Sequence, residues 1–128
     1  MSLTEQLLSP IEEIYTFVRP AYPNLDDETV RDLIVGHWLF GTIDVVYREG
    51  KIIAVVRWNV SKDGKIFEVL DLVIAPGERG FILMKHLIAR NWHRFPTVEY
   101  IRFQRLNKYP TRGWRLYTIR DILKVRTR

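Results

Sequence analysis

One stretch of this chain decides its fold: residues 65–95, KIFEVLDLVIAPGERGFILMKHLIARNWHRF. Residues 66–74 are apolar apart from two acids, which predicts a central strand that is covered on both faces. An Ala-Pro pair ends this strand, a loop at residues 77–80 follows, and a helical pattern begins at Phe81. The first turn of a helix carries unpaired N–H groups that attract an anion. The unit therefore predicts either a site for a phosphate-bearing cofactor or only a tight turn.

The predicted helix at residues 81–95 has apolar residues at helical spacing, which indicates a buried stripe. Its members are Phe81, Met84, Ile88, Trp92 and Phe95. Residues 99–105 read as a further strand. The connection through the helix is long enough for a parallel crossover between the two strands.

Two helices and a hairpin precede this unit. Apolar spacing predicts a first helix over residues 4–18, and Asp26 or Asp27 suits the N-cap of a second helix that runs to about Trp38 and ends at Gly41. Residues 42–48 and 52–60 alternate as strands do. In the second of them we expect one shared face for a set of five side chains: Ile52, Ala54, Val56, Trp58 and Val60.

Composition limits the classes of function. The 128 residues suit one domain, and 47% apolar with 27% charged residues is ordinary for a globular protein. The absence of cysteine excludes a thiolate nucleophile and a cysteine metal site. The three histidines do not have metal-ligand spacing, so no metal is expected. The N-terminus lacks the pattern of a signal peptide and no apolar run could span a bilayer, so we expect a cytoplasmic protein without a membrane partner.

The order of elements and the segment EVLDLVIAP, followed by Arg79-Gly80 and a helix, resembles the Gcn5-related N-acetyltransferase (GNAT) fold over about residues 27–106. The resemblance implies an α/β single domain over residues 1–128, with a mixed sheet in which an antiparallel meander leads into a parallel crossover through one helix. It implies acetyl-CoA as acyl donor and a primary amine as acceptor. It also implies a final helix and hairpin, for which the residues after Arg105 leave little room.

In the GNAT family the end of this strand binds the pantetheine arm, and the turn with the helix N-terminus holds the pyrophosphate. The resemblance carries these roles to a set of cofactor-binding residues: Val73, Ile74, Ala75, Gly77, Arg79, Gly80, Phe81 and Ile82. The sequence departs from the family pattern where two small residues are usual, because Ile82 and Met84 stand there. Small residues allow the backbone to approach a phosphate closely, so the fold matches better than the cofactor loop does.

Acyl transfer to an amine needs a base and a proton donor for the leaving thiolate. Glu68 lies on the central strand among apolar neighbours and matches the strand position of the catalytic glutamate in some family members; the alternative is a strand carboxylate paired with Lys or Arg. Strict alternation places Asp71 on the opposite face, where a salt-bridged core acid is expected. Tyr117 loosely resembles the family's proton-donating tyrosine, and Tyr109 is the alternative; either also suits ordinary packing.

The segment 102–128 is strongly basic, with nine Lys or Arg residues and one acid, Asp121. Cations alternate with aromatic rings in it, a pattern that suits phosphate contacts and base stacking. It suits equally the 3′-phosphate of coenzyme A, or a solvated outer face. The leading hypothesis is therefore an acyl-CoA-dependent N-acyltransferase, with a homodimer possible. The alternative is a non-catalytic GNAT-like module that binds nucleic acid or an acidic partner.

Overall fold

The computed structural model describes residues 3–103 and 115–124 and places five strands in one mixed sheet. Helices α1 (Leu3–Val18) and α2 (Asp27–Phe40) come first, joined by a short 3₁₀ helix, η1 (Arg19–Ala21). Strands β1 (Ile43–Arg48), β2 (Lys51–Val60) and β3 (Ile66–Ile74) follow. Next come α3 (Gly80–Asn91), the 3₁₀ helix η2 (Trp92–Arg94), β4 (Tyr100–Phe103), β5 (Arg115–Thr118) and α4 (Ile119–Leu123). The predicted α/β architecture is confirmed.

The strand order is β1-β2-β3-β4-β5. The pairs β1–β2, β2–β3 and β4–β5 are antiparallel, and β3–β4 is parallel. The meander and the parallel crossover through α3 are therefore both present, as the sequence predicted. After β4, the described residues 115–124 form a short strand and a short helix, β5 and α4.

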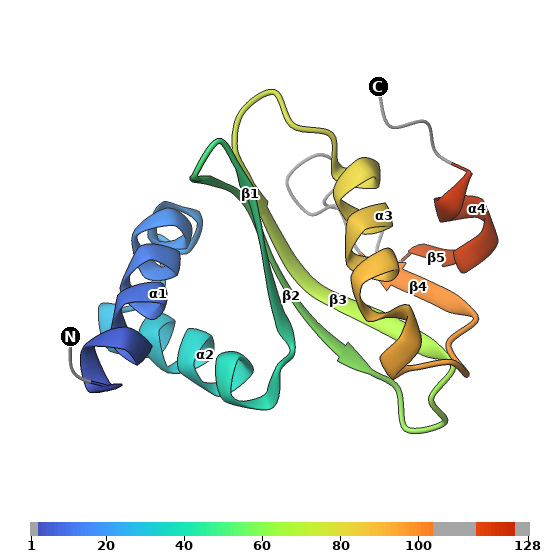
Figure 1. Ribbon diagram of the computed structural model, residues 1–128, viewed down its shortest axis with the longest axis horizontal. Coiled ribbons are helices and arrows are strands. Elements are labelled where there is room, and N and C mark those ends of the chain that lie inside the picture. The colour runs from blue at the N-terminus through green and yellow to red at the C-terminus, as the bar shows by residue number, and fades with distance from the viewer. Residues whose placement is uncertain (1–2, 104–114, 125–128) are drawn as a thin grey trace.

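The helices cover both faces of the sheet. In Figure 1, α1 and α2 lie on one side of the strands and α3 and α4 on the other. The face under α3 and α4 holds an aromatic group in which Phe67 meets the rings of Trp58 and Phe95 edge to face, with centroids 5.2 and 5.6 Å apart. The face under α1 and α2 holds a smaller cluster around Ile14, Val30 and Ile34. We call these the α3 face and the α2 face.

Local chemistry explains where α2 begins and ends. Asp26 is the N-cap, and its Oδ1 accepts a hydrogen bond of 2.7 Å from the amide of Thr29. Gly41 adopts the left-handed conformation with φ of 67° and closes the helix through bonds to His37 and Trp38. A residue without Cβ takes this conformation at the least cost. Both positions were predicted.

Helix α3 is shorter than predicted, and its buried stripe is wider. It ends at Asn91, and Phe95 lies beyond it. The prediction of Met84 and Ile88 as buried residues is confirmed, but Leu83 and Leu87 are buried as well. The buried stripe is wider than the sequence pattern suggested because α3 packs against both the sheet and α4.

Two register shifts change which side chains share a face. Along β1 and β2 the pairing moves from Val46–Ala54 to Tyr47–Ile52, so β2 has one extra residue there. Ile52 consequently packs in the α2-face cluster, and the predicted single face of β2 is wrong at this end. The second shift lies in β3, where the pairing moves from Arg57–Asp71 to Trp58–Val69 and leaves Leu70 as the extra residue. Such bulges bend a strand and re-aim its side chains.

Candidate functional site

The parallel pair β3–β4 opens after three residue pairs. Ile66, Phe67 and Glu68 pair with residues 100–102. From Val69 to Ile74, β3 pairs with β2 on one side, and no strand among the described residues pairs with its other side. The two parallel strands therefore separate beyond Glu68. Their separation leaves a free strand edge that leads toward the N-terminus of α3.

The backbone amides at the end of β3 divide between the two sides. The amide of Ala75 donates to the carbonyl oxygen of Ile53 at 2.8 Å, so it belongs to the β2 ladder. Because amides alternate along a strand, that of Val73 turns to β2 as well, and those of Leu72 and Ile74 turn to the open edge. Of the predicted pantetheine-binding residues, Ile74 therefore has its amide on the open side, whereas those of Val73 and Ala75 serve the ladder.

The turn after β3 delivers the chain to the start of α3. Gly77 has φ of 87°, a conformation that glycine adopts without strain. The first backbone bond of α3 runs from the amide of Leu83 to the carbonyl oxygen of Arg79, at 3.3 Å. The amides of residues 80–82 consequently have no partner within the helix, and no acid lies in its first turn. Arg79 adds an exposed positive charge beside these donors.

The two large residues at the family's small positions do not both face this turn. Met84 is 2% exposed and packs in the core of the α3 face. Its side chain therefore points away from the free amides. Ile82 is half-buried. Of the two large residues at the family's small positions, only Ile82 is therefore left to affect the turn.

The predicted catalytic residues lie on opposite faces of the sheet. Glu68 pairs with Arg102 on the α2 face, with Oε1 2.9 Å from Nη2. Tyr117 packs on the α3 face, where its ring stacks on Phe103 with centroids 5.3 Å apart. The structure does not bring Tyr117 and Glu68 together. The alternative tyrosine, Tyr109, lies outside the described residues.

Asp71 shares its face with Glu68, so the predicted opposite placement is wrong. With strict alternation, residue 71 would share a face with Val69. Instead Leu72 packs with Val69 on the α3 face, because Leu70 is the extra residue of the bulge. Asp71 therefore turns to the α2 face. Its expected role as a salt-bridged acid is confirmed, since its Oδ2 accepts bonds of 2.9 and 2.6 Å from Nε and Nη2 of Arg57.

A polar network that sequence reasoning missed surrounds this ion pair. Nε2 of His37 lies 3.3 Å from Nη1 of Arg57, and Nδ1 lies 2.7 Å from Oγ1 of Thr42. An arginine can only donate, so Nε2 accepts and Nδ1 carries the proton of a neutral imidazole. Burial, followed by the charge of Arg57, lowers the pKa of His37. Burial and a hydrogen bond with Asp71 raise the pKa of Tyr22.

The network joins the helical hairpin to the sheet at the bulge. Tyr22 comes from the α1–α2 connection, His37 from α2, Arg57 from β2 and Asp71 from β3. The available sequence signal was a lone Arg between Val56 and Trp58 and a lone Asp in an apolar strand. Such isolated charges indicate partners, but their spacing does not say which.

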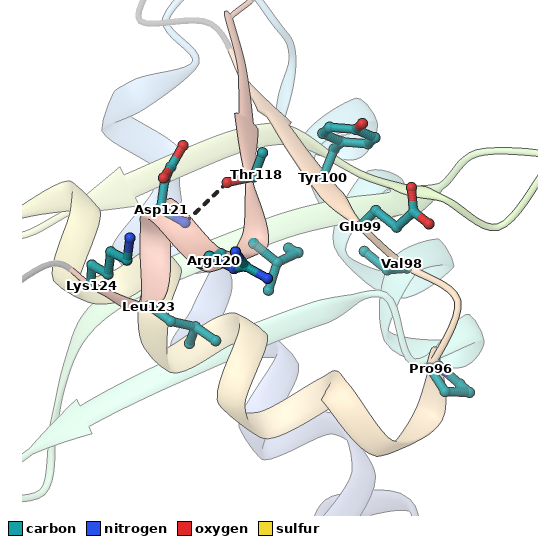
Figure 2. A pocket seen from close by; sticks show the side chains of 10 residues that line it. Pro96, Val98, Glu99, Tyr100, Thr118, Arg120, Asp121, Leu123 and Lys124 are labelled. Carbon is teal, nitrogen blue, oxygen red and sulfur yellow. Dashed lines mark hydrogen bonds between the residues drawn. The ribbon is translucent and has the colours of Figure 1, made fainter.

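A surface pocket of about 930 Å³ lies elsewhere, at the other end of α3 (Figure 2). Its lining comes from Pro96, the start of β4 and the segment from Thr118 to Lys124, where Oγ1 of Thr118 accepts a bond from the amide of Asp121. None of the predicted cofactor or catalytic residues lines it. Since α3 is 12 residues long, about 18 Å separates its two ends.

Two further features concern metals and membranes. In residues 3–103 and 115–124, no three His, Asp or Glu side chains gather where they could hold a metal ion. Within the same ranges, no helix has the length and apolar character to cross a membrane.

Most of the basic, aromatic segment, including Arg105, Lys108, Arg112 and Trp114, lies outside the described residues.

Comparison with solved structures identifies the fold. The aminoglycoside 6′-N-acetyltransferase from Enterococcus faecium superposes with a TM-score of 0.55 at 8% identity, over 80% of this chain and 57% of its own. Tetrahymena GCN5 gives 0.57 at 16% identity, over 80% and 64%. The GphF GNAT-like decarboxylase in complex with isobutyryl-CoA gives 0.54 at 13% identity, over 82% and 68%. No protein-family model and no curated protein matches the chain.

These likenesses show that the chain has the GNAT fold that the sequence resemblance implied. The chain spans less than two thirds of the length of the first two structures. The third is described as a decarboxylase, so the fold is compatible with more than one reaction. The residues of the site, rather than the fold alone, therefore determine the reaction.

Proposed function

We propose that this protein is an acyl-CoA-dependent N-acyltransferase that transfers an acetyl group from acetyl-CoA to a primary amine. One observation carries the proposal: the edge of β3 that no described strand pairs with leads directly to the N-terminus of α3, where the amides of residues 80–82 have no partner within the helix. An extended arm that ends in a diphosphate needs a strand edge followed by an anion site, in that order. The GNAT fold supports the same reading.

The residues present fit such a ligand. The amides of Leu72 and Ile74 are available to pair with the amide groups of a pantetheine arm. The amides of residues 80–82 and the charge of Arg79 suit the pyrophosphate, because a helix N-terminus favours negative charge. The nearby Glu78 carboxylate is paired with Arg48, which limits its repulsion of an anion. Acetyl-CoA supplies an acyl group activated as a thioester.

Glu68 is the proposed base. It lies at the point where β3 and β4 separate, the last pair in their register. There it would take the proton of the acceptor ammonium and leave the amine free to attack the thioester carbonyl. Positioning of the amine beside the thioester supplies most of the remaining acceleration. Tyr117 stays a weaker proposal for the proton donor to the thiolate, since it stacks on the α3 face.

Calorimetric titration with acetyl-CoA and with free coenzyme A tests the cofactor site. We expect micromolar binding of both, and weaker binding by Arg79→Ala. Lys62→Ala is the control, because Lys62 is an exposed cation in the β2–β3 turn. Absence of binding at millimolar ligand would contradict the proposal.

Glu68→Gln tests the base separately. We expect acetyl transfer to fall by about 10²- to 10⁴-fold, the usual contribution of a general base, with acetyl-CoA affinity unchanged. Unchanged turnover would remove Glu68 from the mechanism and leave the cofactor site standing.

The alternative, a non-catalytic module for nucleic acid or an acidic partner, rests on the basic segment 102–128. Its described part carries only Arg102, Arg115, Arg120 and Lys124 as cations. Arg102 is already paired with Glu68. Binding to nucleic acid therefore stays a prediction from composition, and a homodimer stays a prediction from the little room that the family's final elements have after Arg105.

A further inference from the structure

Four strands bring one row of side chains together on the α2 face. The register pairs Asn59 with Glu68, Glu68 with Arg102 and Arg102 with Leu116. The α3-face packing of their neighbours Val69, Ile101 and Phe103 turns this row toward the opposite side of the sheet. Asn59 is exposed, and Leu116 is 55% exposed. The row is thus accessible to a small molecule beside the separation of β3 and β4.

The centre of the row holds one anion and one cation in contact. The side chains of Glu68 and Arg102 keep 25% and 37% of their surfaces exposed. The neighbouring acid, Asp71, is engaged by Arg57 and does not add a spare negative charge. A ligand that reaches Glu68 therefore meets the guanidinium of Arg102 as well.

This arrangement discriminates among amines by their other charges. An ammonium alone would compete with Arg102 for Glu68 and bring a second positive charge beside the guanidinium, which is unfavourable in a partly buried site. A polyamine would add more positive charge next to it. A zwitterion exchanges partners instead, because its ammonium binds Glu68 while its carboxylate binds Arg102.

We propose that the acceptor is a small amino acid with an apolar side chain, bound through Arg102 and Glu68 with its side chain against Leu116. This inference rests on the proposed function and names its substrate class. In the reaction the ammonium gives a proton to the Glu68 carboxylate, and the amine nitrogen attacks the thioester carbon. The new C–N bond forms as the C–S bond breaks. As the amide forms, the nitrogen loses its second proton, which reaches the departing coenzyme A thiolate through water, and Glu68 returns the first proton to solvent.

Leucine and leucinamide form the matched pair of probes, because leucinamide keeps the amine and the side chain but has no carboxylate. With acetyl-CoA present, we expect kcat/KM for leucine to exceed that for leucinamide by about tenfold or more, as a charge-assisted contact supplies. We expect spermidine to be the poorest acceptor. Arg102→Gln should raise KM for leucine and lower KM for leucinamide, because the carboxylate of leucine loses its partner and the ammonium of leucinamide no longer meets a neighbouring positive charge. Arg120→Gln, an exposed arginine on α4, is the control variant.

Binding without cofactor separates this inference from the proposed function. Leucine and leucinamide are titrated into the unmodified protein, and the amide chemical shifts of Asn59, Glu68 and Arg102 are followed. Shifts with leucine alone support the inference even if acetyl-CoA fails to bind. No shifts with leucine, equal affinity for both probes, or a preference for spermidine overturns it, whatever the result with acetyl-CoA.

Discussion

Replacing Ile74 by proline tests whether a ligand pairs with the open edge of β3. Ala75 donates its amide to Ile53 at 2.8 Å, so the amide of Ile74 points away from β2. Proline at residue 74 therefore removes one N–H that the β2–β3 ladder does not use. Extended backbone accepts the φ of proline, and proline is tolerated where a strand edge is free. The substitution therefore removes a hydrogen-bond donor to a ligand without removing a hydrogen bond of the fold.

The expected loss of coenzyme A affinity follows from the loss of a single backbone hydrogen bond. Loss of such a bond, with the ligand's acceptor left unsatisfied, costs about 1–2 kcal/mol. Since 1.4 kcal/mol is a factor of ten, the Kd for coenzyme A should rise about 5- to 30-fold. The side chain of Ile74 is already 37% exposed, so its loss should lower Tm by only about 4 °C.

Ile74→Ala is the matched control, because it removes the same side chain and keeps the amide. Calorimetric titration of coenzyme A into the two variants and the unmodified protein isolates the N–H. We expect Ile74→Ala to bind as the unmodified protein does and Ile74→Pro to bind more weakly. Equal affinity of the two variants would show that no ligand pairs with this edge and would remove the main support for the proposed function.

Three further substitutions test the structure around the site. Burial raises the pKa of Asp44, so the folded state holds a proton more tightly than the unfolded state does. The free energy of unfolding therefore falls as the pH rises from about 3.9 through the raised pKa. Asp44→Asn should reduce this fall, measured by urea unfolding between pH 3.5 and 7. The lowered pKa of His37 has the opposite sign, because the unfolded state binds more protons as pH falls through about 6.5. His37→Gln should therefore reduce the loss of stability between pH 7 and 5, and an unchanged loss would place its cause elsewhere. Phe67→Ala should cost about 3–5 kcal/mol of unfolding free energy, since the buried ring meets Trp58 and Phe95 edge to face; a cost below about 1 kcal/mol would contradict that packing.

The sequence predicted the fold wherever local signals were strong. The strand–turn–helix unit was predicted from the largely apolar run of β3, the proline after it and the helical pattern beyond, and the observed limits of the strand agree with the prediction. The cap at Asp26 and the terminator at Gly41 set the limits of α2 in the same way. These signals are short-range, because the period of a strand and the cap of a helix depend on residues that are close in the sequence.

The polar contacts of the site were less accessible from sequence. The partner of Glu68 is Arg102, 34 positions away, and Asp71 meets Arg57 and Tyr22 from two other elements. Sequence reasoning expected a Lys or Arg partner for each acid without naming it. Pairing between elements depends on register, which hydrophobic pattern alone does not set at polar positions.

The single extra residue at Leu70 decides what the α2 face can do. Strict alternation would have sent Asp71 to the α3 face, among Phe67, Val69 and Ile101, where a carboxylate would need a buried partner. The bulge turns it instead to Arg57, whose charge it compensates. Arg57 is thereby engaged and does not compete with Arg102 for Glu68. A deletion of Leu70 would make Asp71 follow Val69 directly, so regular alternation would keep Asp71 on the α2 face; the deletion should remove the bulge and leave the Arg57–Asp71 ion pair in place. A deletion variant in which Asp71 no longer pairs with Arg57 would refute this account of the bulge.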